Sequence, residues 1–147
     1  MYKAGTGALS EHPFELLFGF IAIGGGLGAA LGVVSPTSIN AVLPMLVVHA
    51  WGVLQFAAGV AVVAGIVISG RTGSLLTGWR VERAGLWPLA ITLVIYAVVA
   101  IVYSGARAIY PAAWYAVFAA ACIARARALS RLEATVQKHM KKESGGH

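Results

Sequence analysis

The chain has 147 residues, of which 59% are apolar and only 11% are charged, and its formal net charge is +6. So few charged side chains cannot coat the surface of a water-soluble fold of this length, which excludes an ordinary soluble globular domain. Lipid is therefore expected to be the main solvent of this protein.

Four apolar runs with almost no charge occupy most of the chain, at residues 14–34, 43–69, 86–103 and 109–124. Crossing ~30 Å of hydrocarbon takes about 20 predominantly apolar residues in a helix. The runs predict an all-α fold, a polytopic membrane protein whose residues 1–124 form a four-transmembrane-helix bundle. The fourth run is short and rich in alanine, so three crossings is the main alternative.

Small residues recur at four-residue intervals in the first two runs. They are Gly24, Gly28 and Gly32 in the first run, and Ala57, Ala61 and Gly65 in the second. Such faces let two helix backbones approach closely, which is what drives helix association in lipid. We expect these residues to pack helices, and the length of the glycine face indicates a homo-oligomer. Packing within one monomer is the alternative.

Polar side chains inside the predicted spans are few, and His49 and Gln55 of the second run are the candidates for an intramembrane role. Hydrogen bonding between helices is the alternative for both. A nucleophile with its base, paired carboxylates or a metal cluster would be needed for catalysis, and the sequence shows no such set. No enzyme activity, cofactor or metal site is expected.

Basic residues gather in two segments that we expect to lie at the membrane surface. They are Arg80 and Arg83 in the connection 70–85, and Arg125, Arg127 and Arg131 after the fourth run. The connection near Gly105 carries only Arg107. By the positive-inside rule the two basic segments are cytoplasmic. The prediction is a multi-pass protein of the inner membrane with both termini inside.

The tail at residues 125–147 is basic, and Leu129, Leu132, Val136 and Met140 recur in it at helical spacing. This pattern predicts a basic amphipathic C-terminal helix that contacts anionic membrane lipids; a solvated tail is the alternative. Since orientation explains most of the positive charge, no nucleic-acid partner is expected. A protein partner could instead bind the connection 70–85 or the tail.

The order of these features resembles a known class of protein. A short N-terminus, a glycine-rich first span, the segment 80–86 leading into a tyrosine-containing span, and a basic tail are similar to the small four-span membrane proteins of actinobacterial phages, some of them holins. The resemblance implies a protein that oligomerises in the inner membrane and permeabilises it. The alternatives are a non-permeabilising scaffold or superinfection-exclusion protein, and a small channel or transporter.

Overall fold

A computed structural model of the chain describes residues 13–33, 41, 43–70 and 75–144. The helices in this part are α2 (Pro13–Ala30), α4 (Met45–Ser69), α5 (Leu75–Ser104) and α6 (Ile109–Ser144), and the short 3-10 helix η1 (Gly105–Ala108) joins the last two. These elements include no strand. The predicted all-α fold is confirmed.

Three helical segments of the described chain are long and apolar enough to cross a membrane: Pro13–Ala30, Met45–Ser69 and Leu75–Lys141. The predicted count of four spans is not matched, because α5, η1 and α6 follow one another with no loop between them. The positive φ of 58° at Gly105 is a conformation that glycine adopts readily. It lets the chain reverse direction inside a helical connection.

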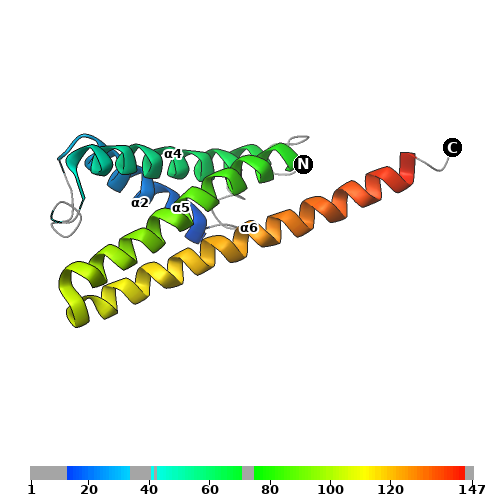
Figure 1. The fold of residues 1–147 in the computed structure, drawn as a ribbon. Helices are drawn as coiled ribbons and strands as arrows, with labels where there is room; N and C mark the ends of the chain where they lie inside the picture. Colours follow the sequence, from blue (N-terminus) through cyan, green and yellow to red (C-terminus); the bar gives the residue numbers. More distant parts are fainter. Residues whose placement is uncertain (1–12, 34–40, 42, 71–74, 145–147) are drawn as a thin grey trace.

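The helices pack in chain order, α2 on α4, α4 on α5, and α5 on α6. Figure 1 shows α5 and α6 as an antiparallel pair joined by a tight turn, with α6 continuing well past the other helices. The main core forms where these layers meet, around Val62 and Ile66 of α4, Leu86 of α5, and Ala126 and Leu129 of α6. We call the end of the bundle that holds η1 the turn end.

The helix α2 ends four residues before the apolar run 14–34 does, and Gly32 is the reason. Gly32 has a φ of 67°, its N–H donates to the carbonyl of Ala29 at 3.1 Å, and the N–H of Val33 donates to the carbonyl of Gly28 at 3.0 Å. These are the two hydrogen bonds of a Schellman motif, which terminates a helix. Gly32 therefore caps α2.

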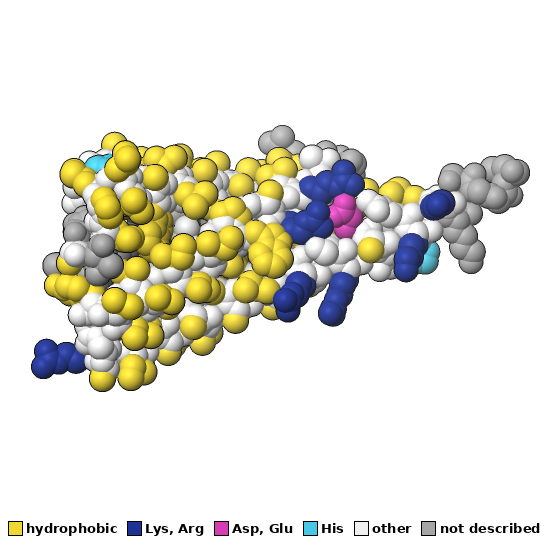
Figure 2. Space-filling model, in the orientation of Figure 1, with side chains coloured by type: hydrophobic (Ala, Val, Ile, Leu, Met, Phe, Trp, Pro, Cys, Tyr) yellow, Lys and Arg dark blue, Asp and Glu magenta, His cyan; other side chains and the backbone are white. Residues whose placement is uncertain are grey.

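The predicted tail is a direct continuation of the last apolar run, since α6 passes through residue 124 with no break and reaches Ser144. At 1.5 Å per residue its 36 residues extend about 54 Å. In Figure 2 hydrophobic side chains cover the body of the molecule, and basic side chains gather where α6 leaves it. The basic part of α6 thus projects from the bundle.

Candidate functional site

Six charged side chains meet where α5 begins and α6 leaves the bundle, at the end opposite to the turn end. We call this group the charge cluster. It consists of Glu15 of α2, Arg80, Glu82 and Arg83 of α5, and Arg125 and Glu133 of α6. It connects three helices by ion pairs.

Glu82 is the most enclosed member of the charge cluster, with only 1% of its surface exposed. The Nε of Arg125 donates to Glu82 at 2.9 Å and lies 3.7 Å from the carboxylate of Glu15. A charge buried without a partner would be very costly. The guanidinium of Arg125 therefore compensates the Glu82 carboxylate and draws α2, α5 and α6 together.

The local sequence explains why a carboxylate can be buried at this position. Gly78 and Gly85 lie one turn before and after Glu82 on the same face of α5. All three face α4, where a Cβ on Gly65 would lie 2.6 Å from the Cα of Glu82, and a Cβ on Gly78 would lie 2.6 Å from the Cα of Ser69. The close backbone approach at these glycines excludes solvent from Glu82.

The second centre of the charge cluster is Glu133, which lies beyond the predicted span 109–124. It accepts hydrogen bonds from the Nε of Arg80 at 2.6 Å and from Nη1 of Arg83 at 3.0 Å. Arg83 also donates to the hydroxyl of Ser130 at 3.1 Å. The hydrogen bond from Arg80, aided by the charges of both arginines, holds the pKa of Glu133 below its usual value. Glu133 therefore stays ionised at neutral pH.

Sequence reasoning missed this cluster, because it treated the basic residues as a surface group and gave the glutamates no role. Arg80, Arg83 and Arg125 form ion pairs within the chain, and Arg127 and Arg131 are exposed on α6. A signal was available in the spacing of Gly78, Glu82 and Gly85, which places a carboxylate between two small residues on one helix face.

The predicted glycine face of α2 is not the face that packs against α4. Gly24 is exposed, and a Cβ added there would meet no atom of the described residues within 4 Å. Gly28 is half-buried. The contact with α4 uses Gly19, Ala22 and Gly26 instead, and a Cβ on Gly26 would lie 2.8 Å from the carbonyl oxygen of Gly52.

The three small residues predicted in the second run have different environments. Gly65 is buried against Glu82, and Ala61 faces α5, where its Cβ would lie 2.9 Å from a Cβ on Gly85. Ala57 is exposed. The face of α4 that contacts α5 thus includes two of the three predicted positions.

His49 and Gln55 lie on α4 near its contact with α2. The Nδ1 of His49 donates to the carbonyl oxygen of Met45 at 2.9 Å, and the His49 ring also lies beside Gly32. The amide of Gln55 lies beside Gly25, 3.6 Å from the position of an added Cβ. The structure brings neither residue into the charge cluster.

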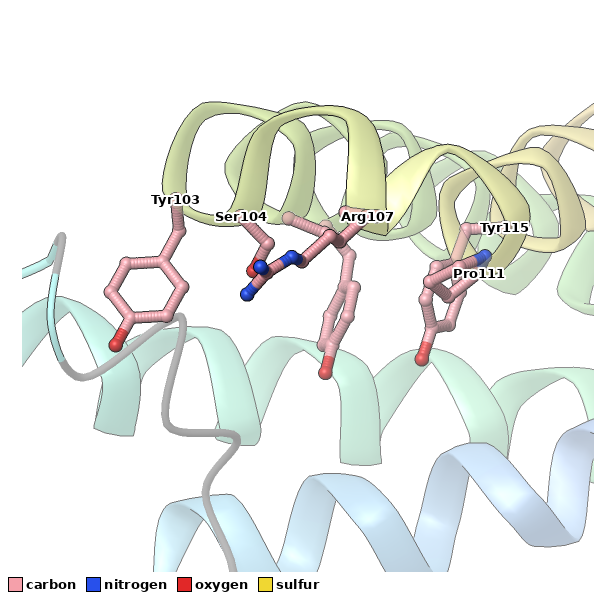
Figure 3. A pocket seen from close by; sticks show the side chains of 8 residues that line it. Tyr103, Ser104, Arg107, Pro111 and Tyr115 are labelled. Atoms are coloured by element: carbon pink, nitrogen blue, oxygen red, sulfur yellow. The ribbon is translucent and has the colours of Figure 1, made fainter.

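A pocket of about 590 Å³ opens at the turn end, between the end of α5 and the start of α6. Its polar lining includes Arg107, Ser104 and the tyrosines Tyr96, Tyr103 and Tyr115. Figure 3 shows the side chains of Tyr103, Arg107 and Tyr115 on the same side of the α5–α6 turn. The pocket and the charge cluster lie at opposite ends of the bundle.

Comparison with known proteins adds no relative from which a role could be inferred. No family model, curated protein or solved structure matches the chain. Within the part that the structure describes, no group of three or more His, Cys, Asp or Glu side chains could hold a metal ion.

Proposed function

We propose that this chain is a holin-type membrane protein that oligomerises in the inner membrane and permeabilises it. The proposal rests on one observation: the backbone at Gly24 is exposed, on a face of α2 that does not contact α4. The resemblance to small phage membrane proteins and the apolar exterior of the helices support the same reading.

Gly24 forms a notch between large side chains. Phe20 and Leu27, about one turn away on either side, are exposed, and no atom of the described residues lies within 4 Å of a Cβ added at Gly24. A glycine inside a helix costs about 0.5–1 kcal/mol relative to alanine, and the described part of the monomer shows no close contact at Gly24 that compensates that cost. Since helices associate in lipid through close packing of small residues, a second copy of α2 is the natural occupant.

The proposed topology has four crossings, with α5 and α6 each spanning the membrane and both termini in the cytoplasm. Two observations support it. The helices α5 and α6 run antiparallel (Figure 1), and the basic side chains of the charge cluster lie at the end opposite to η1. Under the positive-inside rule the cluster is then cytoplasmic and η1 faces outward.

In this mechanism the protein accumulates as separate copies and then associates through the Gly24 face of α2. Exposed positions on the apolar helices are dominated by large aliphatic side chains such as Val53, Leu54 and Ile91. A water-filled lesion needs a polar lining. Assembly must therefore rearrange the helices rather than simply surround a pore with the outer faces seen in the monomer.

A non-permeabilising scaffold or exclusion protein is the second candidate, and the projection of α6 favours it. Past Glu133, which pairs with α5, α6 presents exposed Lys138 and His139 as it projects from the other helices (Figure 1). Such a surface suits a protein partner in the cytoplasm. A channel or transporter has less support, because polar side chains inside the apolar helices are few.

The test is inducible expression of the full chain in a bacterial host, with membrane potential and growth followed over time. The variants are Gly24→Leu, which fills the notch, and Ala50→Leu, which enlarges an exposed small residue of α4 outside it. We expect abrupt depolarisation by the wild type and by Ala50→Leu, and none by Gly24→Leu at equal membrane expression. Normal potential with the wild type would contradict permeabilisation and favour the scaffold.

A further inference from the structure

The pocket at the turn end has a composition that differs from the rest of the apolar body. Hydroxyl groups of Ser104 and of tyrosines from both α5 and α6 line it together with the guanidinium of Arg107. Two of these tyrosines, Tyr96 and Tyr115, are in contact, with their ring centroids 4.3 Å apart and the ring planes inclined at 42°. The lining therefore combines one positive charge with several hydrogen-bond donors.

The position of Arg107 follows from the backbone at the turn. Gly105 adopts a positive φ of 58°, and the 3-10 turn that follows places Arg107 beside the pocket, where the residue is exposed. The acidic side chains that the structure describes are Glu15, Glu82 and Glu133, and each pairs with an arginine of the charge cluster at the other end of the bundle. No described acidic side chain therefore neutralises Arg107.

Arg107 lies at the opposite end of the bundle from the arginines of the charge cluster. If the charge cluster is cytoplasmic, Arg107 faces the outer side of the membrane, where basic residues are disfavoured during insertion. Tyrosine rings prefer the same depth, because their hydroxyls reach water while the rings remain in the apolar phase. The pocket would then lie at the level of the lipid headgroups.

We propose that this pocket binds a phosphate group, with Arg107 as the charged ligand and the hydroxyls of Ser104 and the tyrosines as further donors. The planar guanidinium matches two phosphate oxygens at once, and hydrogen bonds from a charged donor are the stronger ones. Hydroxyl donors can satisfy the remaining oxygens. The inference takes the depth of the pocket from the proposed topology, and it does not depend on permeabilisation.

The phosphate could belong to an anionic phospholipid or be free in solution, and the surroundings of the pocket suit a lipid. Val102, Ile109 and Tyr110 near the pocket are all exposed. Acyl chains could cover these side chains while the headgroup phosphate contacts Arg107.

The first arm of the test uses native mass spectrometry of the full chain released from nanodiscs of mixed phosphatidylglycerol and phosphatidylcholine. We expect the wild type to retain phosphatidylglycerol preferentially, and Arg107→Gln to weaken this retention roughly tenfold, as expected for losing a charge-assisted hydrogen-bond pair. Arg107→Lys, which keeps the charge without the planar fork, should weaken it less. The control Arg127→Gln removes an exposed arginine of α6 and should leave retention unchanged.

The second arm adds inorganic phosphate to the delipidated protein in detergent and follows the midpoint of thermal unfolding. A phosphate-dependent rise in the wild type that Arg107→Gln lacks, without lipid selectivity in the first arm, would support the same site with free phosphate as its ligand. Equal behaviour of the wild type and Arg107→Gln in both arms would overturn the proposal. An equal loss of lipid in Arg107→Gln and Arg127→Gln would also overturn the proposal, because lipid retention would then depend on the total positive charge of the protein and not on this pocket.

Discussion

Glu82 shows how a single carboxylate can hold several helices together in a chain with few charges. Its side chain is buried, and its partner Arg125, 24% exposed in its own side chain, also approaches Glu15. An ion pair of this kind adds little net stability compared with apolar packing, yet breaking it leaves an uncompensated charge. The main effect of the pair is therefore to determine which helices contact one another, and its net contribution to stability is small.

Replacing Glu82 by alanine should destabilise the fold because Arg125 loses its closest partner and a cavity forms beside α4. We expect the free energy of unfolding to fall by about 3 kcal/mol, the lower end of the range for breaking a buried pair. Reversible unfolding in detergent, followed by circular dichroism, measures this change.

The control for that experiment is Arg127→Ala, which removes a neighbouring arginine that is exposed on α6. A surface substitution of this kind is expected to change stability by no more than about 0.5 kcal/mol. Equal stability of Glu82→Ala and Arg127→Ala would contradict the structural role of Glu82.

At the level of the helices, glycine sets the distance between α4 and α5. Gly65 of α4 lies against the backbone of Glu82, and Gly85 of α5 lies against α4, where an added Cβ would be 2.6 Å from the carbonyl oxygen of Ala58. Side chains at these positions would force the helices apart. In lipid, apolar burial does not drive helices together, so close van der Waals packing at such glycines stabilises the helix contact instead.

Gly65→Ala should therefore destabilise the protein, since a Cβ there meets backbone that cannot move without displacing α5. We expect a loss of about 1–3 kcal/mol, the usual cost of overpacking. The matched variant Gly24→Ala adds the same methyl group in open space and should leave the monomer as stable as the wild type, or more stable by about 0.5 kcal/mol. Unfolding of monomeric protein in detergent distinguishes the two, and equal effects would contradict the close contact at Gly65.

For the molecule as a whole, the two ends differ in chemistry. One end holds the charge cluster and the projecting part of α6, and the other holds η1 with its single arginine. In a membrane this asymmetry orients the protein, because basic residues are retained on the cytoplasmic side. This asymmetry and the antiparallel packing of α5 and α6 are the two observations that support the four-span topology proposed above.

Cysteine accessibility tests that topology. In a Cys122→Ala background, which removes the one native cysteine, single cysteines are introduced by Ala106→Cys at the turn end and by His139→Cys near the end of α6, both at exposed positions. A membrane-impermeant maleimide added to intact spheroplasts should label the first variant, and should label the second only after lysis. Labelling of both from the same side would indicate that α6 does not cross the membrane.

The helical fold, the presence of helices long and apolar enough to cross a membrane, and the separation of basic from apolar segments could be predicted from the sequence alone. A helix that crosses lipid needs about 20 consecutive, mostly apolar residues, and such a run can be recognised directly in the sequence. The number of separate helical segments is less readily predicted, because Gly105 lets the chain reverse through a 3-10 turn with no loop between α5 and α6.

Which residues meet was decided only by the tertiary structure. The first helix carries small residues on more than one face, and spacing by itself does not show that Gly19, Ala22 and Gly26 contact α4 while Gly24 points outward. The charge cluster likewise joins positions far apart in the chain, such as Glu82 and Arg125. Local periodicity determines the faces of a helix, whereas the partner of each face depends on how the whole chain packs.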